Sequence, residues 1–121
     1  VVVLAPLTDE TRHMINRDVF ALMKPSAVLV NVARGPLVHT DDLVEALRSG
    51  QIGGAALDVT DPEPLPDGHP LWDFPQCLIT PHTANTFTVI EQRMGGLVVA
   101  NAAAFEAGER MPNEVNLETG Y

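Results

Sequence analysis

Four short apolar runs are the feature that most constrains the fold of this 121-residue chain. They cover residues 1–4, 27–32, 53–59 and 77–80, and they lack the strict polar–apolar alternation of a strand with one wet face. Strands that are apolar on both faces are typical of parallel sheets covered by helices on both sides. Segments with helix signals separate the runs. The chain is therefore predicted to be an α/β protein with a doubly wound parallel sheet.

The helix signals lie at the ends of these connecting segments. Asn16 is placed to cap a helix that ends before Pro25, and Thr40 is placed to cap the helix that follows it. A longer helix is expected over residues 84–107. Residues 60–76 contain five prolines, so an irregular loop is expected there.

Composition and charge exclude several classes of partner. The formal net charge of −9 argues against a nucleic-acid partner, because an acidic surface repels a polyanion. No apolar run is long enough to span a bilayer, so no membrane partner is expected. Cys77 is the single cysteine, which excludes an internal disulfide and favours a reducing compartment such as the cytoplasm. No histidine pair has metal-ligand spacing, so no metal site is expected.

Charged side chains follow three of the four predicted strands. Arg34 comes after the second strand, Asp58 and Glu63 come at and after the third, and His82 comes after the fourth. The carboxyl ends of parallel strands share one edge of the sheet, and ligands bind along that edge. We therefore expect these four side chains to lie along one rim.

The chemistry of this rim suits a small organic acid. The guanidinium of Arg34 can hold a carboxylate through two parallel hydrogen bonds, and His82 beside an acid can give or take a proton. A small 2-oxo or 2-hydroxy acid, with a nicotinamide as the source of hydride, fits these groups. Taken singly, each residue also has a structural interpretation: a surface arginine, a helix-capping histidine, a loop glutamate and a turn-capping aspartate.

Several motifs resemble those of one enzyme family. They are NVARG at residues 31–35, GAALDV at 54–59, DPEP at 61–64 and LITPHTA at 78–84. In this order and spacing they are similar to the D-isomer-specific 2-hydroxyacid dehydrogenases, and the similarity covers nearly the whole chain. The resemblance implies a Rossmann-like dinucleotide-binding domain and an oxidoreductase of D-2-hydroxy acids and 2-oxo acids.

The resemblance also implies roles for particular residues. Arg34 corresponds to the arginine that binds the substrate carboxylate, His82 to the histidine that donates a proton to the carbonyl, and Glu63 to the acid paired with that histidine. The implied cofactor is NAD or NADP, with no preference readable. The residues implied to face it are Ala5, Thr8, Val32, Ala33, Arg34, Asp58, His82 and Ala84.

The resemblance implies a domain organisation as well. No G-x-G-x-x-G turn occurs in the chain. Residues 1–107 are therefore expected to form the second half of a dinucleotide-binding domain, incomplete at its N-terminal half. Residues 108–121 are expected to lead back toward a substrate domain that is mostly absent. A homodimer is the expected assembly.

Three alternatives bear on the function. A cofactor-sensing binding protein, like the co-repressors that share this fold, would keep the same arginine, glutamate and histidine. The chain by itself could be an inactive fragment, since it lacks the glycine-rich turn that receives the pyrophosphate. Formate dehydrogenases resemble the pattern with glutamine in place of the acid, so Glu63 argues against them.

Overall fold

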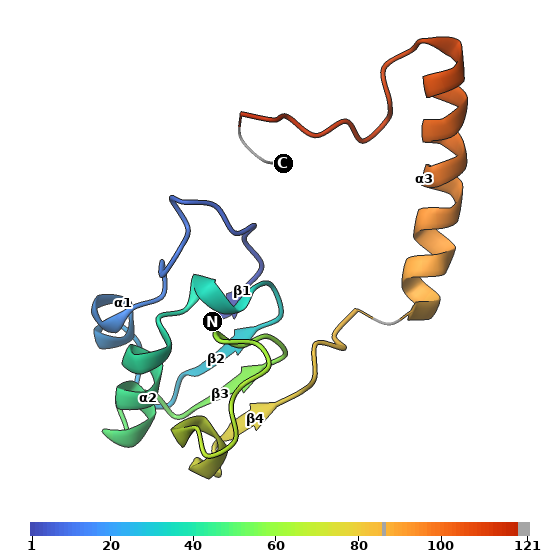
Figure 1. The fold of residues 1–121 in the computed structure, drawn as a ribbon. Coiled ribbons are helices and arrows are strands. Elements are labelled where there is room, and N and C mark those ends of the chain that lie inside the picture. Colours follow the sequence, from blue (N-terminus) through green and yellow to red (C-terminus); the bar gives the residue numbers. More distant parts are fainter. Residues whose placement is uncertain (86, 119–121) are drawn as a thin grey trace. The chain divides into compact units, whose positions relative to one another are not determined.

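The computed structural model describes residues 1–85 and 87–118, without the side chains of residues 88, 89, 92 and 93. The chain divides into two compact units, Val1–Ala84 and Asn85–Tyr121. The first unit contains a sheet with its helices, and the second contains one long helix, α3 (Figure 1). Each unit is described by itself below.

The first unit is built on four parallel strands. They are β1 (Val2–Val3), β2 (Val28–Asn31), β3 (Gly54–Leu57) and β4 (Cys77–Ile79), and they lie in the order β1-β2-β3-β4. Each is paired in parallel with its neighbour. The prediction of a parallel α/β fold is confirmed, although each strand is shorter than its apolar run.

The carboxyl ends of the strands are aligned. Val3 pairs with Asn31, Asn31 pairs with Leu57, and Leu57 pairs with Ile79. These four residues form one row across the sheet at the point where the strands end. The residues that follow the row on each strand therefore share one rim, as expected from the sequence.

Helix α1 (Arg17–Ala21) begins as the sequence predicts. The side chain of Asn16 accepts hydrogen bonds from the main-chain N–H groups of Asp18 at 3.1 Å and Val19 at 3.4 Å. An N-cap of this kind satisfies amides that have no partner inside the helix.

Helix α2 (Thr40–Arg48) begins one residue earlier than predicted. His39 occupies the N-cap position without a capping side-chain bond, and Thr40 is already helical. The Thr40 hydroxyl donates instead to the carbonyl oxygen of Asp61 at 2.7 Å. The prediction that Thr40 caps the helix is therefore wrong, because a main-chain acceptor 21 residues away takes its hydroxyl.

Helical turns also occur where the sequence indicated loops. One 3-10 turn spans Gly35–Leu37 and a second spans Pro70–Asp73, inside the proline-rich stretch. In the second unit, α3 spans Phe87–Ala107, which is shorter at its start than the expected 84–107. It ends at Gly108, which has a φ of 68°, a conformation that glycine adopts at little cost.

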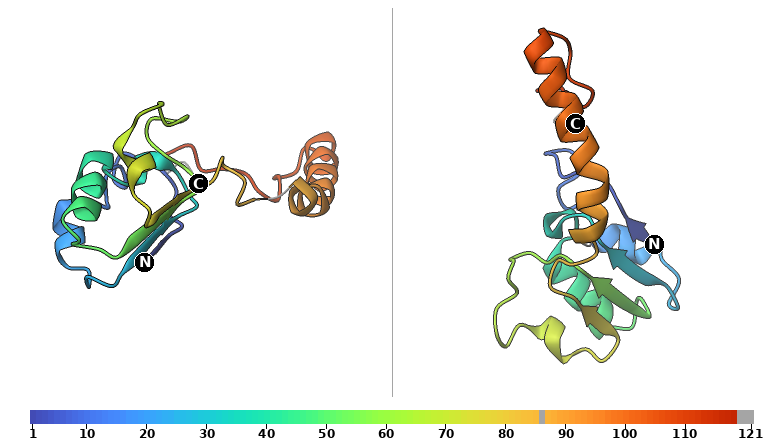
Figure 2. Two further views of the ribbon diagram at one scale, coloured as in Figure 1. Left: turned by 90° about the horizontal axis from the view of Figure 1, so that it is seen from below. Right: turned by 90° about the vertical axis from the view of Figure 1, so that its right-hand side faces the viewer.

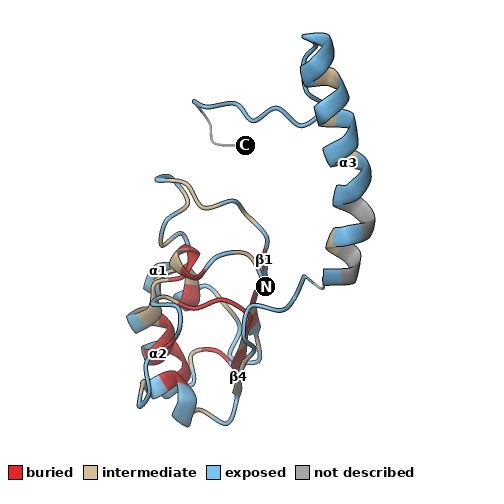
Figure 3. Cartoon of the chain, turned by 45° about the vertical axis from the view of Figure 1, so that its right-hand side comes forward, coloured by how far each residue is buried: buried red, intermediate tan, exposed pale blue. Residues whose placement is uncertain are grey.

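Helices cover one face of the sheet within the first unit. Helices α1 and α2 contact each other and lie on the same side of the strands (Figure 2). Buried residues gather between them and the sheet, among them Phe20, Leu29, Leu43 and Leu57 (Figure 3). On the other face Leu78 is 63% exposed.

The sequence pattern predicts cover on both faces, and the strand order explains the difference. Each strand is added on the same side of the one before it. Right-handed crossovers in one direction all pass over the same face of a parallel sheet. The strands therefore carry apolar side chains on a face of the sheet that α1 and α2 do not cover.

Among residues 1–85 and 87–118, no helix has the length and apolar character of a membrane-spanning segment.

Candidate active site

The predicted site residues all lie beyond the aligned ends of the strands. They come from four loops: Ala5 and Thr8 follow β1, Val32, Ala33 and Arg34 follow β2, Asp58 and Glu63 follow β3, and His82 and Ala84 follow β4. Neighbouring strands lie about 4.8 Å apart, so the ends of β2 and β4 are separated by roughly 10 Å. A small molecule can span that distance with the help of one long side chain.

Glu63 and His82 form a direct pair. Glu63 Oε1 lies 2.6 Å from His82 Nδ1, and the two side chains are 41% and 50% exposed. The residues are 19 positions apart in the sequence, and the structure brings them together as predicted. Because Glu63 engages Nδ1, Nε2 is the ring nitrogen that can face a substrate.

The backbone of His82 is held in an uncommon conformation. Its φ is 55°, in the left-handed region that residues other than glycine seldom adopt. Its main-chain N–H donates to the carbonyl oxygens of Asp58 at 2.9 Å and Thr80 at 3.0 Å. Such a conformation persists where surrounding contacts determine it, and it is common at functional sites.

Asp58 supplies most of those contacts. Its carboxylate is buried, and Oδ1 accepts hydrogen bonds from Thr80 Oγ1 at 2.6 Å and the Thr83 N–H at 2.8 Å. Oδ2 accepts a bond from the Ala84 N–H at 2.8 Å. The side chain of Asp58 therefore ties down residues on both sides of His82.

These bonds also determine the charge state of Asp58. Burial by itself raises the pKa of the Asp58 carboxyl, but the bonds from Thr80, Ala84 and Thr83, together with the nearby His82, outweigh it. The pKa of Asp58 consequently lies below its ordinary value. The group is a carboxylate at neutral pH and can accept each of these bonds.

Arg34 is exposed at the rim. Its Nη1 donates to the carbonyl oxygen of Ala33 at 2.7 Å. The next residue, Gly35, is buried, and a β-carbon there would lie 1.9 Å from the carbonyl oxygen of Thr60. The loop after β2 therefore packs directly against the loop after β3, and this contact fixes the main chain beside Arg34.

Sequence reasoning missed two polar residues of this rim. Asn31 is 1% exposed, and its side chain bonds to the main chain of Ala33 and Arg34. Thr80 binds Asp58, as described above. Thr80 ends its apolar run and Asn31 is the last residue but one of its run, so a polar residue near the end of a buried strand was the available signal.

The cofactor candidates after β1 form a tight turn. The Thr8 N–H donates to Thr11 Oγ1 at 2.8 Å, and that hydroxyl donates to the carbonyl oxygen of Pro6 at 2.7 Å. Ala5 and Ala33 contribute small side chains at the ends of the neighbouring strands β1 and β2.

A pocket of about 440 Å³ borders the Glu63–His82 pair. Leu65, Trp72 and Ile79 contribute its apolar part. Because both members of the pair line the pocket, a small molecule can reach them from outside.

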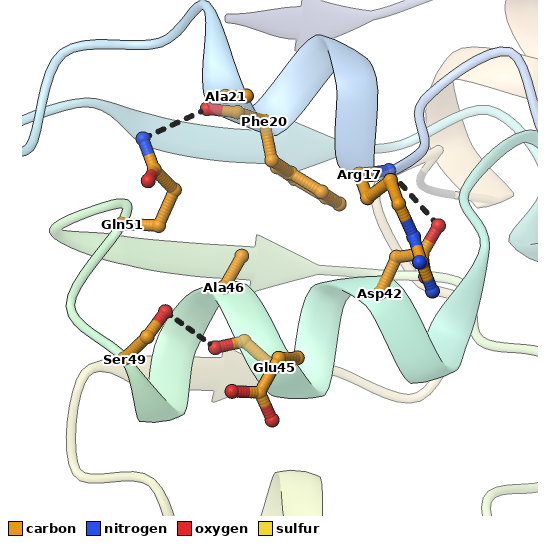
Figure 4. A pocket seen from close by; sticks show the side chains of 8 residues that line it. All are labelled: Arg17, Phe20, Ala21, Asp42, Glu45, Ala46, Ser49 and Gln51. Carbon is orange, nitrogen blue, oxygen red and sulfur yellow. Dashed lines mark hydrogen bonds and ion pairs between the residues drawn. The ribbon is translucent and has the colours of Figure 1, made fainter.

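A second pocket, of about 320 Å³, lies between α1 and α2 (Figure 4). Its polar side chains bond to nearby groups: Arg17 pairs with Asp42, and Gln51 donates to the carbonyl oxygen of Phe20. The eight residues that line it include none of the predicted site residues. This pocket is part of the packing between the two helices.

Cys77 has no sign of reactivity. Burial raises the pKa of its thiol to about 11, so the thiol stays protonated at neutral pH. Among the described residues, no three side chains of histidine, cysteine, aspartate or glutamate group as metal ligands.

Residues 1–84 match the family described as D-isomer specific 2-hydroxyacid dehydrogenase, NAD binding domain. The chain belongs to this family. The resemblance seen in the motifs is thereby confirmed, and the matched residues coincide with the first compact unit. They also include every predicted site residue.

Two named reductases are similar to the chain over most of its length. The glyoxylate reductase of Thermofilum pendens is 48% identical over 113 residues, which are 93% of this chain and 33% of that protein. The human glyoxylate reductase/hydroxypyruvate reductase is 44% identical over 117 residues, which are 97% of this chain and 36% of that protein. The chain therefore spans about a third of the length of these relatives.

A solved structure supports the fold. The D-isomer specific 2-hydroxyacid dehydrogenase from Xanthobacter autotrophicus Py2, crystallised with NADPH and MES, matches with a TM-score of 0.92 and 45% sequence identity. The match covers 100% of this chain and 49% of that one. The parallel, Rossmann-like fold predicted from the sequence is confirmed by this likeness.

Proposed function

We propose that the full-length protein containing this chain is an NAD(P)-dependent oxidoreductase of a small D-2-hydroxy acid and its 2-oxo acid. Membership in the family supports the reaction type. The two similar reductases described above are a glyoxylate reductase and a glyoxylate reductase/hydroxypyruvate reductase, and glyoxylate and hydroxypyruvate are small 2-oxo acids. The proposal assigns the reaction to the rim at the carboxyl ends of the strands.

The single observation that carries the proposal is the Glu63–His82 pair. A carboxylate 2.6 Å from Nδ1 orients the imidazole and leaves Nε2 as the ring nitrogen that can face a substrate. A protonated imidazole can then donate its Nε2 proton to the carbonyl oxygen of a 2-oxo acid during reduction. In the reverse direction, the neutral ring accepts the proton of the hydroxyl group.

Arg34 is proposed to hold the substrate. Arg34 follows β2 and His82 follows β4, two strands away along the same rim. A guanidinium can bind the substrate carboxylate through two parallel hydrogen bonds. This contact would place the neighbouring carbonyl oxygen toward His82. A nicotinamide cofactor, when bound, supplies or accepts the hydride.

The chain has residues suited to that cofactor. Asp58 Oδ2 accepts one main-chain bond, and a carboxylate oxygen has room for a second donor such as a carboxamide N–H. The other proposed contacts come from Ala5, Thr8, Val32, Ala33, Arg34, His82 and Ala84, all beyond the strand ends. The proposal covers both NAD and NADP.

Three further expectations stay predictions. They are the homodimer, the cytoplasmic location, and the division of the chain into a half domain at residues 1–107 and a connecting segment at 108–121. Cys77 as the single cysteine supports the location, since it indicates a reducing compartment.

Turnover by the full-length protein tests the proposal. The loss of NADH or NADPH absorbance should be followed with glyoxylate, hydroxypyruvate and pyruvate, and the product of hydroxypyruvate should be the D isomer. His82→Ala should lower kcat by roughly a hundredfold or more, because proton transfer to the carbonyl is lost. A cofactor-sensing binding protein would bind NADH without comparable turnover, and that outcome would refute the enzyme assignment.

A further inference from the structure

Asn31, the last residue of β2, has a buried side chain with hydrogen-bond partners for both its oxygen and its nitrogen. The residue is 1% exposed, and a buried amide must find partners for both its ends. Nδ2 donates to the carbonyl oxygen of Arg34 at 2.9 Å, and Oδ1 accepts from the Ala33 N–H at 3.1 Å. A flipped amide would make neither bond, because the carbonyl only accepts and the N–H only donates.

These two bonds hold the main chain on both sides of the Arg34 α-carbon. The guanidinium then donates from Nη1 to the carbonyl oxygen of Ala33, the same residue whose N–H is bound by Asn31. Gly35 packs against the carbonyl of Thr60 on the far side. The side chain of Arg34 is exposed, but the main chain from which it extends is held by the buried side chain of Asn31.

Asn31 also touches the other half of the rim. Its main-chain oxygen accepts a hydrogen bond from the Asp58 N–H at 2.9 Å. The Asp58 carboxylate in turn binds the residues that flank His82. Asn31 therefore lies between the group proposed to bind the substrate carboxylate and the turn that carries the proposed proton donor.

We infer that Asn31 is the positioning residue for Arg34, setting where the guanidinium meets the carboxylate of a 2-oxo acid. This inference rests on the proposed function and adds a residue to it. A purely structural role would make Asn31 matter for stability alone. A positioning role makes it matter for substrate binding through Arg34, and the two can be separated by steady-state kinetics.

Asn31→Ala in the full-length protein is the first test, with glyoxylate as the probe. We expect KM for glyoxylate to rise about tenfold or more, with kcat changed by less than about threefold, because substrate capture is what Arg34 supplies. Asn16→Ala is the matched control. It removes an asparagine that bonds main-chain groups at the start of α1, so it should lower Tm and leave KM for glyoxylate unchanged. An unchanged KM in Asn31→Ala, or an equal rise in the control, would overturn the inference.

A double-mutant cycle tests whether Asn31 acts through Arg34. In an Arg34→Ala background, adding Asn31→Ala should raise KM by less than about twofold, because the group being positioned is gone. Independent, multiplicative effects would contradict a positioning role. Arg34→Ala with normal KM would remove the carboxylate anchor itself, and wild-type protein without turnover of any 2-oxo acid would overturn both proposals.

Asn31→Asp keeps the shape of the side chain and guards against misfolding of the alanine variant. The carboxylate can accept from the Ala33 N–H, but it can donate to the Arg34 carbonyl only when protonated. KM for glyoxylate in this variant should therefore rise with pH relative to the wild-type value. A ratio of the two KM values that stays near one across the pH range would also count against the inference.

Discussion

A β-carbon placed on Gly35 would lie 1.9 Å from the carbonyl oxygen of Thr60, so the loop after β2 touches the loop after β3 with no space between them. Both contacting groups belong to the main chain. The Thr40 hydroxyl adds a bond to Asp61 in the same second loop. The spacing between the loops that carry Arg34 and Glu63 therefore depends on the absence of a side chain at one position.

Gly35→Ala should push these two loops apart. The added methyl group cannot be accommodated by a side-chain rotation, so we expect a loss of about 1–3 kcal/mol in the free energy of unfolding. Turnover of a 2-oxo acid by the full-length protein should fall as well. Denaturant unfolding and steady-state kinetics measure the two effects.

Gly95→Ala is the control for this change. It adds the same methyl group in α3, where no described atom outside the neighbouring turns lies within 4 Å. Alanine should stabilise that helix by about 0.5–1 kcal/mol relative to glycine. A Gly35→Ala protein with wild-type stability and activity would show that the loops can separate freely.

Arg34→Lys tests the proposed substrate anchor. Lysine keeps the charge but loses the planar pair of donors, so substrate capture should weaken by about 1.5–3 kcal/mol. This corresponds to a fall of roughly tenfold to over a hundredfold in kcat/KM for glyoxylate. Arg48→Lys, on the exposed end of α2, is the matched control and should leave kcat/KM unchanged. Equal values for the two variants would remove Arg34 from the site.

Glu63→Gln tests the pair with His82. Glutamine can still accept a hydrogen bond from His82 Nδ1, but this bond lacks the charge assistance of a carboxylate and orients the ring less firmly. Reduction should therefore slow. Steady-state kcat/KM for glyoxylate in wild type and variant gives the comparison. An unchanged kcat/KM would show that the two side chains are not coupled in the reaction.

Asp58→Asn tests the turn that holds His82. The amide cannot accept all three bonds made to the carboxylate, so we expect a loss of about 2 kcal/mol in the free energy of unfolding near neutral pH. The pKa of Asp58 is lowered in the folded state, so its contribution is present above its ordinary range and is lost as pH falls through the folded value. The difference in Tm between wild type and variant should accordingly shrink in acid. A constant difference would argue against the ionised form as the stabilising one.

Asp42→Asn should show the same sign of pH dependence away from the site. Burial raises the pKa of Asp42, but bonds from the main chain and side chain of Arg17 and the charges of His39 and Arg17 outweigh it, so the pKa is lowered. The carboxylate joins α1 to the start of α2. Its contribution to Tm should be full at neutral pH and should fade below about pH 4. Asp41→Asn, an exposed neighbour in the same turn, controls for the effect of charge at the helix start.

The sequence predicted the architecture because the signals for it are local. Apolar runs, the Asn16 cap and the residues after each strand could be read without knowing the neighbours of any segment. Strand lengths could not be predicted in this way, because they depend on how many residues pair with the neighbouring strand. Only Val2 and Val3 of the run 1–4 pair with β2. The start of α2 was misjudged for a similar reason, because the partner of the Thr40 hydroxyl is Asp61 in a distant loop.

The same limit applies to the candidate site. Arg34, Glu63 and His82 could be predicted as candidates because charged side chains that follow buried parallel strands lie along one edge of the sheet, where ligands bind. Asn31 and Thr80 carry a weaker signal, a polar residue near the end of a buried strand, and their role depends on hydrogen-bond partners that the sequence does not show. The residues proposed to bind a ligand stand out in the sequence by their charge. The residues that position them stand out only by the hydrogen bonds that they make in the folded structure.

The direct packing of the loops has a consequence for protein engineering. The loop after β2 packs through Gly35 against the Thr60 carbonyl and bonds through Thr40 to the carbonyl oxygen of Asp61, so moving it alone into another scaffold would remove both contacts. A transplant of the rim would have to carry residues 31–40, 58–64 and 80–84 together. Libraries that vary one loop at a time should yield mostly unstable proteins, and those that vary two facing loops jointly should recover stable ones more often.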